Sequence, residues 1–464
     1  MAGAPSQQPT QQHVIDPATE EAIAAVPLAS AEEVDAAVAR ARAAFPAWRA
    51  LAPGDRARIL RAFADRIDAH RAELADLEVR NAGHPVGQAR GEAAMVRDVF
   101  EYFAGAPERP SGRQIPVPGG WSVTFAEPLG VVGVIVPWNF PMPILSWGAA
   151  PALAAGNTVI VKPAELTPLT AIRLGELALE AGVPEGVLQV LPGTGPVAGE
   201  ALVRHPGVAK IAFTGSTAVG KRIMALCAGD LKRVTLELGG KSANIVFADA
   251  DLEKAAATAP YGVFDNAGQD CCARSRLLVQ RSVFDRFMEL LEPAVKGVVV
   301  GDPHSPATEM GPLISAEHRE KVASYVPDGA PVAFRGSAPS GRGFWFPPTV
   351  LTPSSADDRA FTEEIFGPVV SVLPFEDEAD AVRIADGTAF GLAGSVWTRD
   401  VGRALRVSRA VTAGNLSVNS HSAVRYWTPF GGFKQSGIGR ELGPDALDAF
   451  TDTKTVFISD DSRG

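Results

Sequence analysis

The chain has 464 residues, of which 46% are hydrophobic and 21% are charged, and its formal net charge is −10. This is the composition of a globular protein with material for about two or three domains, and it argues against a disordered chain. The acidic balance argues against nucleic acid as a partner.

Three cysteines are too few for a disulfide framework and suit a reducing cytoplasm. The N-terminal sequence has neither a basic start nor an apolar core, so it does not predict a signal peptide. The longest apolar run, at 148–161, is interrupted by Pro151, Gly156 and Asn157 and is too broken to span a bilayer. We therefore expect a soluble, cytoplasmic protein with no membrane partner.

The first ordered element that the pattern predicts is a helix beginning at about Ser30. Ser30 and Glu33 form a capping box, and apolar residues follow at helical spacing as far as Trp48. A second helix is expected around Phe63.

From residue 131 onward, short apolar strands alternate with stretches of helical period. Strands are expected at 131–136, 158–161, 187–191, 210–213 and 233–236. After Ser242 the alternation starts again, with a strand expected at 244–247, a helix across 251–265, and further strands at 277–280, 369–375, 394–398 and 415–419. Such alternation is typical of parallel sheets covered on both faces, whose ligands bind beyond the carboxyl ends of the strands. The sequence therefore predicts an α/β fold with two doubly wound parallel sheets.

Two segments look appended to these sheets. One is 109–128, which is rich in proline, glycine and polar residues, and the other is the tail 446–464, with a strand expected at 453–458. A terminal strand without a partner is a liability unless another chain completes it. The remaining ranges form the two expected domains, 1–108 with 129–239 and then 240–445.

Two glycine-rich turns each follow a strand and open a helix, at 191–199 and 213–220. Glycine lets the backbone approach a phosphate, and the helix N-terminus supplies free N–H groups. The spacings are GxGxxxG and GxxxxG rather than the dinucleotide fingerprint, so each turn alone favours a plain tight turn over a phosphate site.

Three polar motifs follow predicted strands and a cysteine motif follows a predicted helix, and each is open to two interpretations. Asn139 in PWNFP is either part of a turn or an amide donor aimed into a pocket. Lys162 and Glu165 in KPAE are either a solvated pair or contacts to a ribose. Glu237 is either an exposed acid or a buried base with a raised pKa. Cys271 in NAGQDCCAR is either an inert core thiol or a nucleophile. Adjacent cysteines have poor chelating geometry, so no metal is expected.

In order along the chain, PWNFP, KPAE, FTGSTAVG, ELGGKS, NAGQDC, EEIFGPV and PFGGFKQSGIGRELG resemble the NAD(P)-dependent aldehyde dehydrogenase superfamily, from about Val14 to about Ile458. The resemblance implies an oxidoreductase with a Rossmann-like NAD-binding domain (1–108 and 129–239), a catalytic domain (240–445) and an oligomerisation arm (109–128 and 446–464). It implies NAD as the cofactor, a small-molecule aldehyde as the substrate, and a homodimer or homotetramer.

The resemblance also assigns roles to residues. Cys271 would be the nucleophile, Glu237 the general base, and Asn139 with the Cys271 N–H the oxyanion hole. The expected cofactor contacts are Trp138, Lys162, Glu165, Gly195, Gly215, Ser216, Glu364 and Phe366. The expected substrate pocket contains Phe140, Ile144, Trp147, Asp270, His421, Val424 and Trp427. The implied reaction forms a thiohemiacetal and then a thioester on Cys271, which water activated by Glu237 hydrolyses to the acid.

Two positions depart from the family pattern. Gly148 stands where a lysine commonly assists a proton relay with the glutamate that corresponds to Glu441, which puts that relay in doubt. His84 replaces the lysine of a G-K-P turn, and we interpret this as a surface change.

Asp270 bears on the substrate. An anion beside Cys271 opposes ionisation of the thiol, and an ammonium group on the substrate would offset this, which favours an ω-aminoaldehyde. Arg425 favours a carboxylated semialdehyde instead, and Asp270 could also simply bond the loop backbone. Glu165 favours NAD over NADP. A thiol esterase and a catalytically idle binding protein on the same fold are the alternative functions.

Overall fold

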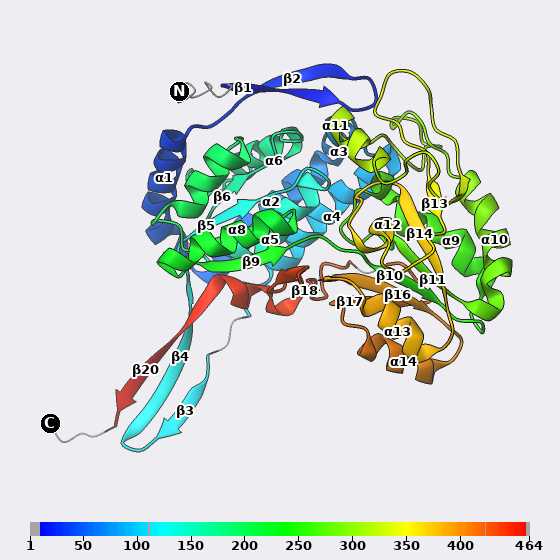
Figure 1. Ribbon diagram of the computed structural model, residues 1–464. Coiled ribbons are helices and arrows are strands. Elements are labelled where there is room, and N and C mark those ends of the chain that lie inside the picture. The colour runs from blue at the N-terminus through cyan, green and yellow to red at the C-terminus, as the bar shows by residue number, and fades with distance from the viewer. Residues whose placement is uncertain (1–9, 110–111, 423, 461–464) are drawn as a thin grey trace, which may run out of the picture.

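Two parallel sheets with helices on both faces make up most of the structure, a computed structural model that describes residues 10–109, 112–422 and 424–460 (Figure 1). The first sheet has the strand order β19-β9-β8-β5-β6-β7. Its members are β5 (Val131–Ile135), β6 (Thr158–Lys162), β7 (Leu188–Val190), β8 (Lys210–Thr214), β9 (Arg233–Glu237) and β19 (Gly437–Ile438). Every residue of β5, β6 and β8 is buried, which explains their continuous apolar sequences.

The second sheet has the order β12-β13-β14-β11-β10-β16-β17. These strands are β10 (Ala243–Val246), β11 (Arg276–Gln280), β12 (Val332–Arg335), β13 (Thr349–Leu351), β14 (Val369–Phe375), β16 (Ala393–Trp397) and β17 (Asn415–Val418). The prediction of two doubly wound sheets is confirmed, although β12 and β19 are antiparallel to their neighbours and the short strands β12 and β13 were not predicted.

Helices bury the faces of the sheets. On one face of the first sheet lie α2 (Pro53–Ala69), α4 (Val86–Ala104), α5 (Pro141–Ala154) and α6 (Leu169–Glu180), and on the other α1 (Ala31–Ala50), α7 (Glu200–Arg204) and α8 (Thr217–Cys227). The second sheet packs against α9 (Leu252–Phe264) and α10 (Phe284–Lys296) on one face and α13 (Glu378–Asp386) and α14 (Val401–Ala410) on the other. The capping box at Ser30 is confirmed.

A β-hairpin precedes α1, so the prediction that order begins at Ser30 was wrong. β1 (Gln11–Asp16) pairs with β2 (Glu21–Pro27) in antiparallel register. Only Val14, Asp16 and Val26 of the two strands are buried, and the apolar residues of β2 run consecutively, so no clear alternation marked these strands. The turn is held by Asp16, whose Oδ1 accepts from the N–H groups of Ala18 (2.8 Å) and Thr19 (3.3 Å).

A three-stranded arm projects from the body (Figure 1). Its order is β20-β4-β3, with β3 (Gln114–Val117), β4 (Gly120–Pro128) and β20 (Thr451–Ser459). β20 pairs with β4 along its whole length, so the tail strand has a partner in its own chain, contrary to the expectation. Ala446 and Phe450 are buried, so the tail leaves the body at about Thr451 rather than at 446.

Helix α3 (Arg71–Ala82) lies beside α4. Two further helices, α11 (Ala316–Ala323) and α12 (Arg359–Thr362), are short. In the described ranges, no helix combines the length and the apolar character that crossing a bilayer requires.

Candidate active site

The Cys271 loop follows α9 and begins with an unusual run of backbone angles. Asn266, Ala267 and Gly268 have φ values of 48°, 54° and 71°, in the left-handed region that side chains rarely adopt. A Cβ on Gly268 would lie 2.2 Å from the carbonyl oxygen of Gly367, so only glycine lets the two loops touch. Strained backbone of this kind is concentrated at functional sites.

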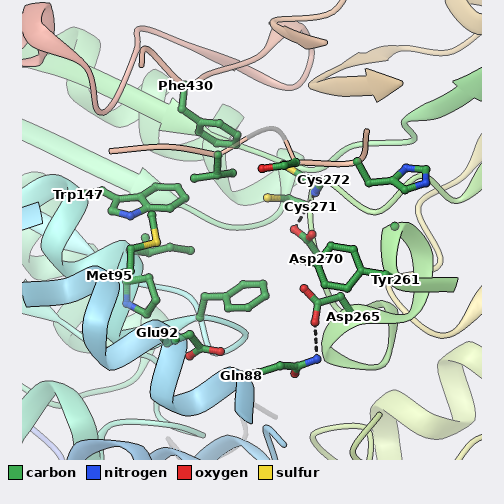
Figure 2. A pocket seen from close by; sticks show the side chains of 18 of the residues that line it. Gln88, Glu92, Met95, Trp147, Tyr261, Asp265, Asp270, Cys271, Cys272 and Phe430 are labelled. Carbon is green, nitrogen blue, oxygen red and sulfur yellow. Dashed lines mark hydrogen bonds between the residues drawn. The ribbon is translucent and has the colours of Figure 1, made fainter. Parts of the chain in front are cut away.

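Cys271 lies where two cavities meet. Among the described residues, Cys271 lines both a cavity of about 350 Å³ and a second cavity of about 200 Å³. Figure 2 shows its sulfur at the edge of the larger cavity. Cys272 is 4% exposed and lines the larger cavity as well, so the neighbour does not face fully away from it.

The acid beside the thiol has a structural contact. Asp270 lines the larger cavity, and its Oδ1 accepts from the backbone N–H of Cys272 at 2.8 Å. The contact with the Cys272 thiol, burial, and the charge of Asp270 together raise the pKa of Cys271 well above its ordinary value. Forming the thiolate therefore needs help from a base or from a substrate that compensates the negative charge.

Asn139 is placed to donate a hydrogen bond beside the thiol. The side chain is buried, and its Nδ2 donates to the carbonyl oxygen of Gln269 at 3.0 Å. Asn266 in turn donates to the backbone oxygen of Asn139 at 2.9 Å. An amide nitrogen carries two hydrogens, so one remains for the cavity of about 200 Å³ that Asn139 shares with Cys271. Such a fixed donor can stabilise a developing oxyanion.

Glu237 stands at the end of β9 and lines the same cavity as Cys271. It is 3% exposed, and neither carboxylate oxygen has a hydrogen-bond partner among the described residues. Burial, assisted by the charge of Glu441, raises its pKa well above the ordinary value. A buried acid without a partner beside a cavity is a candidate general base.

The side chain of Val134 leaves no room for a side chain at Gly148. A Cβ there would lie 2.9 Å from Cγ1 of Val134 in β5, so any side chain at this position would require Val134 to move. Burial raises the pKa of Glu441 to about 7. The positive charge of Lys210 in β8 opposes this rise. Lys210 Nζ donates to Thr235 Oγ1 at 2.6 Å, two residues before Glu237 on β9. A lysine from β8 thus lies near the acid that sequence comparison leaves without one.

A third cavity, of about 540 Å³, lies beyond the carboxyl ends of the first sheet's strands. Its lining includes all of Trp138, Lys162, Glu165, Gly195, Gly215 and Ser216. Lys162 Nζ lies 3.7 Å from Glu165 Oε2 and donates to the carbonyl of Gly193 at 3.1 Å. Ser216 caps α8, whose free N–H groups suit a phosphate.

The third cavity shares Trp138, Gly215 and Ser216 with the Cys271–Glu237 cavity. The far wall of that cavity carries Glu364, whose Oε1 accepts from the N–H of Gly240 at 2.9 Å, and Phe366. The rings of Phe366 and Trp138 meet edge to face at 5.3 Å. Two joined cavities, with the carboxylate of Glu165 at one end and the ring of Phe366 at the other, have the elongated form that an extended dinucleotide needs.

The cavity of about 350 Å³ contains most of the residues expected to contact substrate, and we call it the substrate-side cavity. Its lining includes six of the seven expected residues, namely Phe140, Ile144, Trp147, Asp270, His421 and Val424. The seventh expectation was wrong. Trp427 is 50% exposed, does not belong to the described lining, and packs its ring against Tyr426 at 4.5 Å. It follows Tyr426 in the same loop, so neighbouring residues of that loop face different ways.

Several lining residues were missed by sequence reasoning. They include Gln88, Glu92 and Met95 of α4, together with Tyr261, Asp265, Arg274 and Phe430. In Figure 2 the side chains of Trp147, Met95 and Phe430 lie on one side of the cavity, and the carboxylates of Asp270, Asp265 and Glu92 lie along the rest. The α4 residues follow ordinary helical spacing, which carries no signal that they reach a cavity.

The acidic side of the cavity has few opposing charges. Burial raises the pKa of Asp265 to about 7, and its Oδ1 accepts from Gln88. Arg274 is buried and donates to the carbonyl of Cys272 at 2.7 Å and to Ser395 Oγ at 3.1 Å. Burial lowers the pKa of His421 to about 4, so its imidazole is neutral at neutral pH. Arg425 is exposed and is not part of the described lining.

His84 is not a surface residue, so that interpretation was wrong. It is 1% exposed, and its Nδ1 lies 2.7 Å from Glu92 Oε1. Its ring also meets the ring of Phe140 edge-on at 5.5 Å. The G-H-P turn therefore lies directly behind the substrate-side cavity, where the sequence position alone suggested an exposed loop.

Comparison with known proteins agrees with this geometry. The model of the aldehyde dehydrogenase family matches residues 4–456. An aldehyde dehydrogenase of Aspergillus niger is 43% identical over 449 residues, covering 95% of this chain and 90% of that protein. Human retinal dehydrogenase 2 is 44% identical, over 96% of this chain and 88% of its own length. The crystal structure of betaine aldehyde dehydrogenase from Staphylococcus aureus with NAD+ has a TM-score of 0.95 at 39% identity, covering 98% and 92% of the two chains.

Proposed function

The chain belongs to the aldehyde dehydrogenase family, and from that premise we propose that it oxidises an aldehyde at Cys271 and releases the acid by hydrolysis at Glu237. It is an NAD-dependent aldehyde dehydrogenase. The observation that supports the residue roles best is the position of Cys271, which lines both the cavity that holds Glu237 and the cavity on the substrate side. Residues 1–108 and 129–239 would bind the cofactor, and 240–445 would supply the nucleophile.

The chain's own residues account for most of the chemistry. The Cys271 sulfur bonds to the aldehyde carbon, while Asn139 and the Cys271 N–H hold the resulting oxyanion. Bound NAD supplies the hydride acceptor. Loss of hydride from the former aldehyde carbon leaves a thioester on Cys271. Glu237 then takes a proton from a water molecule, which attacks the thioester and frees the thiolate.

The contacts to NAD would come from the cavity of about 540 Å³ and its continuation. Lys162 and Glu165 would hold the adenosine ribose, Gly195, Gly215 and Ser216 the pyrophosphate, and Glu364 and Phe366 the nicotinamide half. Trp138 lines both cavities and would mark their junction.

A screen for NADH formation tests this function. The purified chain is assayed with aliphatic, aromatic, amino and carboxylated aldehydes, and with a chromogenic ester in the absence of NAD. We expect NADH with at least one aldehyde class and an ester rate that is much lower. Ester hydrolysis that needs no NAD, with no NADH from any aldehyde, would identify a thiol esterase instead, and inactivity in both assays would favour a binding protein.

For the substrate we propose an ω-aminoaldehyde. The support is the acidic side of the cavity, where Asp265 and Glu92 lie in addition to Asp270. Asp270, Asp265 and Glu92 each have one carboxylate oxygen in contact with a protein group, so the second oxygen of each acid could meet an ammonium group. The facing aromatic rings of Phe140 and Trp147 would add cation–π contact.

The matched substrates are 4-aminobutyraldehyde, succinate semialdehyde and an uncharged aldehyde of similar length. We expect the highest kcat/KM for the amino substrate, and a loss of that preference in Glu92→Gln and Asp270→Asn. A preference for succinate semialdehyde, or an amino preference that neither variant changes, would refute the aminoaldehyde assignment while leaving the dehydrogenase intact.

We further propose a homodimer or homotetramer joined through the arm. β20 and β3 are the edge strands of that sheet, and Trp121, Phe125 and Phe457 are 43%, 51% and 54% exposed on it. Edge strands and exposed apolar side chains favour pairing with another copy. Light scattering should give at least twice the chain mass, and a mass of 48.5 kDa would contradict this.

We also propose a cytoplasmic location, because a reducing compartment keeps the thiol of Cys271 in the reduced form that catalysis needs.

A further inference from the structure

A compact cluster of three potential ligands lies behind the substrate-side cavity. It consists of Glu78 of α3, His84 of the following turn and Glu92 of α4, each with one ligand atom, and these atoms all lie within 4.8 Å of one another. Gly83 ends α3 with a φ of 78°, and Pro85 precedes α4, so a tight turn sets the imidazole between two helices. Glu78 and His84 are 0% and 1% exposed.

Each member of this Glu78–His84–Glu92 cluster has a buried atom that no other group satisfies. Among the described residues, Glu78 Oε1, His84 Nε2 and Glu92 Oε2 have no hydrogen-bond partner. The cluster's side-chain contacts include His84 Nδ1 with Glu92 Oε1 at 2.7 Å, a long one from Asn81 Nδ2 to Glu78 Oε2 at 3.5 Å, and an interaction of the Thr170 side chain with Glu78. Buried polar atoms are almost always partnered, so three in one place indicate a missing component.

The charges around the cluster are unbalanced. Three carboxylates, those of Glu78, Glu92 and Asp265, act on a single imidazole. Beside them stand the neutral groups of Gln88, which bonds to Asp265, and of Asn81. Buried charges are ordinarily paired or coordinate a metal. A divalent cation would compensate two of the carboxylates at once.

We propose that Glu78, His84 and Glu92 bind a divalent transition-metal ion, with Zn²⁺ as the probe. An imidazole with two carboxylates suits zinc and its neighbours better than magnesium or calcium. Zinc–ligand distances of about 2.0–2.2 Å would require the ligand atoms to draw together by roughly 1 Å, within the reach of side-chain rotation. Glu92 lines the substrate-side cavity, so the ion would enter from that side.

The ion would neutralise Glu92 where it faces the substrate. Zinc and a cationic aldehyde would then compete for the same negative charge, a consequence that rests on the proposed function. Binding of the ion itself does not rest on it, because it can be measured without turnover.

Titration with Zn²⁺ tests the site directly. Asp270, Cys271 and Cys272 form a second group of possible ligands, so the tag-free, chelator-treated chain should carry Cys271→Ala and Cys272→Ala. In this background, calorimetry should show one zinc ion per chain at the cluster, and bound Co²⁺ should give a visible absorption band. Glu78→Gln and His84→Gln should each weaken binding by about 10-fold or more.

His205→Gln is the matched control. His205 also pairs with a carboxylate, Asp35 at 3.0 Å, but on the surface and outside the groups that could hold a metal in the described chain. It should leave zinc binding unchanged. Should Glu78→Gln fail to fold by circular dichroism, Glu92→Gln at the cavity edge serves in its place. No stoichiometric zinc binding in the background chain, or equal affinity in the cluster variants and His205→Gln, would overturn the proposal.

Discussion

The two sides of Cys271 are built in different ways. On the cofactor side, the lining comes largely from turns at the ends of β5, β6, β8 and β9, each a short contiguous stretch of sequence. On the substrate side, the lining comes from α4, α5, the end of α9 and the loop 421–430, which are far apart in the chain. A fixed cofactor can be held by backbone turns, whereas a substrate is distinguished by side chains.

The two sides also differ in charge. The cofactor-side cavity of about 540 Å³ sets Lys162 against Glu165 and Arg222 against Glu200, so the acids of that cavity are paired. On the substrate side, the acids Asp265, Asp270 and Glu92 exceed the cations available to them. We therefore expect changes at Cys271 and Glu237, where the two sides meet, to abolish activity. Changes on the cofactor side should alter cofactor choice, and changes on the substrate side should alter substrate choice.

The largest effect should come from changing Cys271 itself. Cys271→Ala should reduce NADH formation by about 10⁴-fold or more, because the thiolate forms the covalent intermediate. Cys272→Ala should cost less than about 10-fold, through loop packing only. Steady-state rates of both variants with saturating NAD make the measurement. Equal losses would mean that the thiol between the two cavities is not the nucleophile.

Glu237→Gln should separate the two half-reactions. Without a base, deacylation should slow by about 10² to 10³-fold, while the first turnover still yields a burst of NADH close to the number of active sites. Stopped-flow absorbance follows both phases. Because burial raises the pKa of Glu237, the wild-type steady-state rate should fall as pH drops through that raised pKa, and the variant should lose this dependence. A uniform loss without a burst would assign Glu237 another role.

Glu165→Gln probes the cofactor side alone. In the proposed role of Glu165, its carboxylate beside the adenosine ribose would disfavour a 2′-phosphate. Wild type should therefore prefer NAD, and only moderately because Lys162 lies near Glu165. The variant should shift the ratio of kcat/KM for NADP to that for NAD by about 10-fold toward NADP. Glu185→Gln, on the exposed surface, is the control. Higher kcat/KM with NADP in the wild type would contradict the expectation.

The same comparison explains what the sequence could predict. Glu165 and Ser216 were predicted to share a site because each lies in a contiguous motif that resembles the family, and the structure places both in the lining of one cavity. Each motif follows a strand, and parallel strands bring their carboxyl ends to one edge. Glu92 and Met95 were not, since a helix face toward a cavity and one toward the core have the same period. His84 was misread for a related reason: the turn looks exposed in sequence and is buried only by packing of α3 and α4.

The smallest effect should come from changing Lys210, which is not in the described lining of either cavity beside Cys271. Lys210 acts on Glu441, whose charge in turn acts on Glu237. Lys210→Met removes the cation whose charge opposes the raised pKa of Glu441, so that pKa should rise further and more Glu441 should be protonated at neutral pH. In the proposed relay from Glu237 to Glu441, a protonated Glu441 cannot accept the proton that Glu237 takes from water, so deacylation should slow and the acidic limb should follow the pKa of Glu441. We expect a fall of roughly 3- to 10-fold in steady-state rate at neutral pH, an unchanged NADH burst, and a shift of the acidic limb toward higher pH. Lys210→Arg keeps the charge and should retain the wild-type profile.

Stability should not account for this loss. Burial lowers the pKa of Lys210 to about 8, so the folded state disfavours its charged form. The stability that this costs is largest below pH 8 and fades as pH rises toward the ordinary value, where the unfolded chain also loses its proton. Methionine has no such cost and fits beside the Phe450 ring, 4.9 Å from the ammonium it replaces, so melting of Lys210→Met should not fall at neutral pH. An unshifted pH–rate profile with a lowered melting temperature would show that Lys210 serves packing alone.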